Sequence, residues 1–137
     1  MANTTISIIK ALGFSQHNFD VADDAAFDTL ITNELGNQID LIKIDYTAYD
    51  AATVVQKTIL ANAEKFRTAA ALTRIQAAQS NNDAYRELSG QGSSNTENQY
   101  KTAQRYDNQA DIWLAKLGVS KHQANDSGGI ASGVVVS

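Results

Sequence analysis

The sequence predicts an all-α fold: a small helical bundle with a long central helix hairpin and an extended C-terminal tail. The 137 residues contain no proline, which a chain made of helices can do without. Alanine is abundant, and apolar residues recur at intervals of three and four, the spacing of a buried helix face. The length suits one compact domain. We expect this helical domain to cover 1–118 and the tail to cover 119–137.

The first predicted helix is short and ends at Gly13. Thr4 or Thr5 can cap its start. Its apolar residues share one helical face: Ile6, Ile9 and Leu12. The connector that follows is expected to bury Phe14 and Phe19, because exposed phenylalanine is costly.

The second predicted helix begins at Asp23-Asp24, either of which can cap it and favours the positive end of the helix dipole. Its apolar residues have the spacing of an amphipathic helix: Phe27, Leu30, Ile31 and Leu35. The segment 39–46 is ambiguous, because its apolar residues fit a helical period and also alternation. We favour a helix with a kink near Gly36, and a short strand is the alternative.

The third predicted helix, over 48–88, is the longest element, with Thr47-x-x-Asp50 resembling a capping box at its start. One apolar stripe runs along it through Ala52, Val55, Ile59, Ala63, Phe66 and Ala70, and is widened by Val54, Leu72 and Ile75. A helix of this length, about 45–60 Å, exceeds what so small a domain can cover. Part of it is therefore expected to face another subunit.

A glycine- and serine-rich loop is predicted at 89–93, followed by a capping box at Ser94-x-x-Glu97. The fourth helix then runs over 95–117 and ends at Gly118 as a C-terminal cap. Its inner face is predicted to contain Tyr100, Ala103, Ala110, Trp113, Leu114 and Leu117, with Ile112 and Tyr106 towards the flanks. The third and fourth helices make an antiparallel hairpin.

The predicted tail ends in Gly-Gly-Ile-Ala-Ser-Gly-Val-Val-Val-Ser. An apolar, β-branched segment of this kind suits docking on another subunit, for example by adding a strand to a sheet. The candidate partner-binding residues are Val119, Ile130, Val134, Val135 and Val136. The alternative is a frayed terminus without a docking role.

Charge is spread unevenly along the chain. Residues 1–50 hold eight acids against Lys10 and Lys43, a net charge of −6, and residues 51–137 have a net charge of +2. An acidic N-terminal part argues against a sequence-reading nucleic-acid protein, which needs a clustered basic face. The basic residues Lys57, Lys65, Arg67 and Arg74 are interpreted as a solvated helix face.

The sequence predicts no catalytic, cofactor-binding or metal-binding residue. The two histidines, His17 and His122, are far apart in sequence and in predicted loops. Without cysteine, thiolate metal sites and disulfides are excluded. Gly90-x-Gly92 lacks the lysine and the preceding strand of a phosphate loop. The five tyrosines are expected to pack with their hydroxyls in water. No apolar run approaches the length of a membrane span.

The order of elements carries a family resemblance. A short first helix precedes the acidic opening Val-Ala-Asp-Asp-Ala-Ala-Phe-Asp-Thr-Leu-Ile at 21–31, and the long alanine-rich helix and a closing helix with a loose tail follow. This layout resembles the head–tail connector proteins of tailed bacteriophages, also called adaptor or head-completion proteins. The resemblance covers most of 20–118 and is one of layout, without a diagnostic residue signature.

The resemblance implies a structural virion protein at the neck, made in the host cytoplasm. Such proteins form a ring, commonly of twelve copies, beneath the portal protein, where they extend the DNA channel and dock the next neck or tail component. Double-stranded DNA passes through without sequence-specific binding. The tail of this chain would reach the portal. Two alternatives stay open: a cytosolic helical adaptor or regulator, and a small enzyme with carboxylates inside the bundle.

Overall fold

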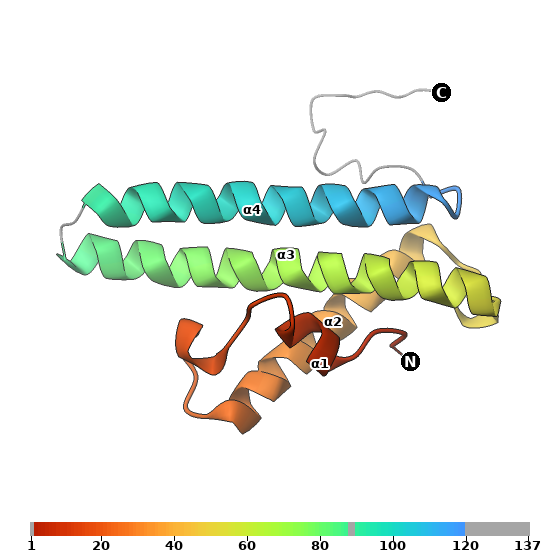
Figure 1. The fold of residues 1–137 in the computed structure, drawn as a ribbon, viewed down its shortest axis with the longest axis horizontal. Coiled ribbons are helices and arrows are strands. Elements are labelled where there is room, and N and C mark those ends of the chain that lie inside the picture. Colours follow the sequence, from red (N-terminus) through yellow and green to blue (C-terminus); the bar gives the residue numbers. More distant parts are fainter. Residues whose placement is uncertain (1, 88–89, 120–137) are drawn as a thin grey trace.

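The computed structural model describes residues 2–87 and 90–119. Within these ranges every regular element is a helix, which confirms the predicted fold class. The elements are α1 (Ile6–Lys10), α2 (Asp24–Asp45), α3 (Val54–Glu87) and α4 (Gly90–Ala115), with 3₁₀ turns at Gln16–Asn18 and Tyr49–Ala51. Figure 1 shows three layers, with α3 between α4 on one side and α1 and α2 on the other.

The predicted hairpin of two long helices is present. Helix α3 has 34 residues, which corresponds to a length of about 51 Å, and α4 lies antiparallel along it (Figure 1). Small residues dominate the buried positions of both helices and permit their close approach: Ala63, Ala69, Ala70, Ala77, Ala103 and Ala110. Tyr100, predicted on the inner face, is exposed instead, because the buried face is centred on Thr96, Ala103 and Ala110, seven residues apart.

Helix α2 is continuous from Asp24 to Asp45, so the helical interpretation of this region is confirmed and the short strand does not occur. The side chain of Asp23 caps it and accepts a hydrogen bond from the Ala26 N–H at 2.8 Å. The helix continues through Gly36 without a break, because one buried stripe runs across this position: Phe27, Ile31, Leu35, Ile39 and Ile42. Burial of this stripe outweighs the low helix propensity of one glycine.

The start of α3 differs from the prediction. The capping box is formed by Thr53 and Gln56, not by Thr47 and Asp50. The Thr53 hydroxyl accepts from the Gln56 N–H at 3.2 Å, and Gln56 Oε1 accepts from the Thr53 N–H at 2.8 Å. Residues 49–51 form a separate 3₁₀ turn, because the Tyr49 side chain is buried there.

The start of α4 also differs. The helix begins at Gly90, so the predicted loop at 89–93 is wrong for 90–93, and Ser94-x-x-Glu97 lies inside the helix rather than at its start. Glycine-rich sequence is a weak local signal, and packing of one long helix along another regularly overrides it.

The N-terminal connector completes the core, as predicted for its two phenylalanines. Phe14 and Phe19 are buried, with ring centroids 6.2 Å apart. Phe19 contacts Phe27 of α2 at 5.1 Å, and Phe14 contacts Tyr106 of α4 at 6.4 Å. The connector therefore packs against elements from both outer layers of the bundle.

Candidate partner-docking surfaces

Of the five predicted partner-binding residues, the structure describes only Val119. Its side chain is 9% exposed and belongs to the core cluster with Leu60, Ile42 and Leu114. Val119 therefore lies in the folded body of the protein, at its boundary with the predicted tail. Ile130, Val134, Val135 and Val136 lie outside the described residues.

A Schellman motif terminates the α4 segment. Gly118 has φ +81° and donates to the carbonyl of Ala115 at 3.0 Å, and the Val119 N–H donates to the carbonyl of Leu114 at 3.1 Å. The buried side chains of Leu114 and Val119 supply the apolar contact that accompanies this motif. The predicted C-terminal cap at Gly118 is thus confirmed.

The end of the bundle next to this cap exposes two aliphatic side chains, which we call the end valines: Val54, 82% exposed, and Val55, 71% exposed. Both were predicted to lie on the packed stripe of α3, and both predictions are wrong. Their exposure follows from the register of the hairpin. Arg67 of α3 lies opposite Asp111 of α4. Because the two helices are antiparallel, counting eight residues on from Asp111 and eight back from Arg67 places Val119 level with residue 59. The end valines therefore lie about one helical turn beyond Val119 along the hairpin axis.

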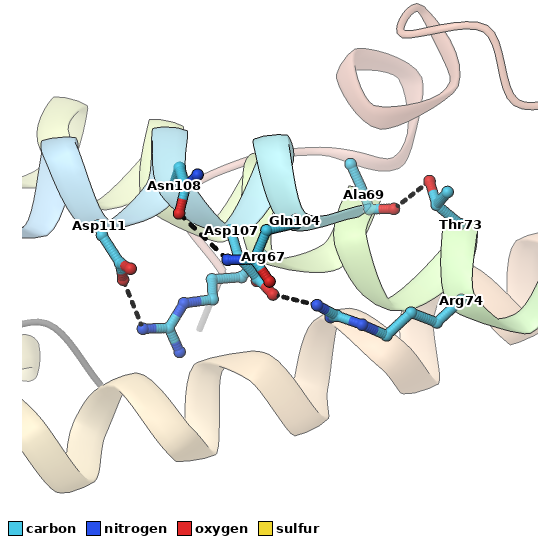
Figure 2. Close-up of polar contacts among 8 residues, drawn as sticks. All are labelled: Arg67, Ala69, Thr73, Arg74, Gln104, Asp107, Asn108 and Asp111. Carbon is cyan, nitrogen blue, oxygen red and sulfur yellow. Dashed lines mark hydrogen bonds and ion pairs between the residues drawn. The ribbon is translucent and has the colours of Figure 1, made fainter. Parts of the chain in front are cut away.

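The hairpin is held by two ion pairs that the sequence interpretation missed (Figure 2). Arg67 Nη2 lies 3.4 Å from Asp111 Oδ1, with both side chains nearly buried. Arg74 pairs with Asp107, one turn along α4. The interpretation of Arg67 as part of a solvated basic face is therefore wrong, because its side chain is only 8% exposed. Arg74, with a side chain 41% exposed, remains partly solvated and pairs with a carboxylate of α4. The sequence contained a signal for these pairs: the two arginines are seven residues apart and the two aspartates four, so each pair of like residues shares one face of its helix.

A second polar cluster, which we call the Glu64 clasp, ties the N-terminal segment to α3. Glu64 is fully buried, and its carboxylate accepts the N–H groups of Asn3 and Thr4 at 2.8 and 3.1 Å. The side-chain amide of Asn3 donates to it at 2.9 Å, and so does the hydroxyl of Tyr49. The expectation that tyrosine hydroxyls meet water is wrong for Tyr49.

The clasp satisfies the electrostatic requirement of a buried carboxylate, because charge-assisted hydrogen bonds offset part of the desolvation cost. Burial, and then the hydrogen bond to Glu64, raise the pKa of Tyr49 well above its ordinary value of 10.0. Both oxygens of Glu64 accept hydrogen bonds from within the chain, so the arrangement serves folding, by anchoring the N-terminal segment.

Among the described residues, no three or more histidine, cysteine or carboxylate side chains are grouped to hold a metal ion. His17 lies exposed in the first 3₁₀ turn, and His122 falls outside the described ranges. None of the helices in the described ranges combines the length and the apolar character needed to cross a bilayer.

Comparison with protein-family models, curated protein sequences and solved structures gave no match. Support for a function therefore comes from the sequence and the structure of this chain. Its clearest feature is a bundle end that exposes two valines next to the capped point where the predicted tail begins.

Proposed function

We propose that this chain is a structural head–tail connector of a tailed bacteriophage. In this proposal, copies form a ring, of twelve by analogy with the family it resembles, beneath the portal protein in the neck of the virion. The ring extends the DNA channel and docks the next neck or tail component. The layout of helices over 20–118 suggested this function, and the bundle end defined above is the observation that supports it best.

The end valines support docking at that end of the bundle. Two largely exposed aliphatic side chains at the start of α3 are unusual for a surface that meets only water, and grouped exposed apolar residues mark interaction sites. The predicted tail leaves the body at the same end, about one helical turn away along the hairpin axis. A partner such as the portal protein could therefore engage the end valines and the tail together.

Charge supports passage of DNA without binding. The chain has a net charge of −4, which a ring multiplies by its number of copies. Two of the cations on the hairpin, Arg67 and Arg74, are paired with Asp111 and Asp107, so these carboxylates offset their charges. A channel wall with an excess of carboxylates repels the DNA backbone and lets it slide.

The experiment is cross-linking in a native lysate of phage-infected cells, followed by mass spectrometry of peptides joined to Lys116. Lys116 is exposed and lies three residues before Val119. The proposal expects links to the portal protein and links between copies. Links only to cellular proteins, or only within a dimer, would overturn it and leave the cytosolic helical adaptor as the better explanation.

Two variants sharpen the test. A chain truncated after Val119 keeps the buried cap, so it should retain its helical circular dichroism and its thermal transition while losing the portal links. The double substitution Val54→Ser, Val55→Ser should weaken the same links. The matched control is Ile8→Ser on α1, because Ile8 is 46% exposed and lies on another part of the surface. Equal loss in the control would show that the effect is not specific to the bundle end.

A further inference from the structure

Helix α4 separates its charges between two sides. Asp107 and Asp111 point towards α3, where they pair with arginines (Figure 2). The exposed side has the opposite charge, and we call it the outer face of α4: Lys101, Arg105, Ile112 and Lys116. These residues are four, seven and four positions apart, so they share one side of the helix. Glu97, one turn before Lys101, is the remaining acid of α4.

Helix α2 has an exposed face of the complementary kind. We call it the outer face of α2: Asn37, Asp40, Leu41 and Ile44, all of which are exposed. Ile44 is 72% exposed and Leu41 41% exposed, although the opposite side of the same helix is fully buried. Helix α2 contains five acids and one lysine, so its surface is strongly acidic.

The two outer faces belong to opposite layers of the molecule. Figure 1 places α4 and α2 on opposite sides of α3. A chain that presents two different complementary surfaces on opposite sides cannot satisfy both in a two-fold dimer. It satisfies them in a head-to-tail contact, which closes into a ring when the rotation between copies permits.

We propose that the outer face of α4 in one copy binds the outer face of α2 in the next copy. Ile112 packs against Leu41 and Ile44, and Asp40 lies near Arg105 of the neighbouring copy. This contact would bury aliphatic side chains that a single copy leaves in water and would place opposite charges around them. The inference rests on the proposed function, because it names the contact through which the ring forms.

The charges also favour contact between α4 and α2 over the symmetric contacts of α4 with α4 or α2 with α2. Two α4 faces brought together would oppose cations, and two α2 faces would oppose acids, each at an electrostatic cost. The contact between different faces is the combination in which both the aliphatic and the charged groups are matched.

Disulfide trapping tests the contact directly, because the natural chain has no cysteine. Full-length Ile44→Cys and Ile112→Cys chains are purified separately, mixed at high concentration and oxidised. The expected result is a covalent dimer in the mixture at a yield well above that of either chain alone, in which exposed thiols join only by random collision. The control mixture pairs Ile112→Cys with Ser7→Cys, which places the thiol at an exposed position of α1 and should give no dimer.

A charge exchange provides the second measurement. Adding Arg105→Glu to the Ile112→Cys chain should lower the dimer yield at least about tenfold, because it opposes Asp40 with a like charge. Adding Asp40→Arg to the Ile44→Cys chain should then restore the yield. Rescue of this kind is not expected if either substitution only disturbs folding.

The outcomes that overturn the inference are distinct from failure of the proposed function. A dimer yield from either chain alone that equals or exceeds the yield of the mixture would contradict the contact between different faces. The head-to-tail contact would also be contradicted by the absence of a dimer in the mixture, or by an equal dimer yield in the Ser7→Cys control. If such a result accompanied cross-links from Lys116 to the portal protein, the connector function would stand and its ring would use other surfaces.

Discussion

The Tyr49 hydroxyl donates a hydrogen bond to the carboxylate of Glu64, and this carboxylate also anchors the backbone of Asn3 and Thr4. One buried side chain of α3 thus organises both the turn before that helix and the N-terminal segment. The relationship explains why the short helix α1 is held against the hairpin although it has only five residues.

Removal of the Tyr49 hydroxyl should destabilise the fold. Tyr49→Phe removes one of the two donors to Glu64 Oε2, and the side-chain amide of Asn3 remains as the other. Because a hydrogen bond to a buried charged group is worth about 1.5–3 kcal/mol, we expect the free energy of unfolding to fall by that amount. Urea unfolding followed by circular dichroism measures the change. The matched control is Tyr100→Phe, with a side chain that is 46% exposed, and it should change stability by less than about 0.5 kcal/mol. Equal effects would show that the clasp contributes nothing specific.

The clasp also predicts a dependence on alkaline pH. The pKa of Tyr49 is raised in the folded state, first by burial and then by Glu64, so its neutral hydroxyl is favoured there. The resulting stability is fully present below the ordinary tyrosine pKa of 10.0 and is lost as the pH rises above it, because the unfolded chain then releases the proton first.

We therefore expect the stability difference between the natural chain and Tyr49→Phe to shrink as the pH rises above 10.0. Urea unfolding of both chains at matched pH values measures this, and the other titrating groups cancel in the difference. A difference that stays constant or grows would contradict the assignment.

The pair between Arg67 and Asp111 should behave as a buried ion pair. Arg67→Met leaves Asp111 without its cation, and we expect a loss of about 3 kcal/mol, at the lower end for such pairs because the contact is 3.4 Å long. The double variant Arg67→Met, Asp111→Leu should recover most of this loss, because no charge is then left buried. A double-mutant cycle in urea provides the measurement.

The control for this pair is the exposed contact between Lys43 and Asp50 at 3.7 Å. Asp50→Asn should change stability by less than about 1 kcal/mol. A double variant as unstable as Arg67→Met alone would show that volume, rather than charge, decides the packing between α3 and α4.

Two glycines should respond to alanine with opposite signs. Gly118 has φ +81°, so Gly118→Ala should cost about 1–2 kcal/mol in backbone strain, although an added Cβ meets nothing within 4 Å. Gly36 lies inside α2 with the same free space, and Gly36→Ala should stabilise the chain by about 0.5–1 kcal/mol. Thermal unfolding of the two variants measures both effects. Stabilisation by Gly118→Ala would contradict the cap, and destabilisation by Gly36→Ala would contradict the account of α2.

Local signals predicted much of this fold. The cap of α2 at Asp23, the end of the α4 segment at Gly118 and the helix hairpin were all predicted correctly. Each of these features depends on residues within one or two helical turns of one another. The Glu64 clasp was missed because its N-terminal donors are about 60 residues away in sequence. The exposure of Val54 and Val55 was also missed, since it depends on where α4 stops relative to α3 and not on the residues of α3.

The cap at Gly118 has a mechanical consequence. Because Val119 is both hydrogen-bonded to Leu114 and buried in the core, a pull on the chain beyond it is transmitted to the packed hairpin and does not first unwind the last turn of α4. If the chain attaches to a partner through the tail, as proposed above, a load on that attachment would reach the packed hairpin through Val119. The strength of such an attachment would then be set by unfolding of the hairpin core and not by fraying at its end.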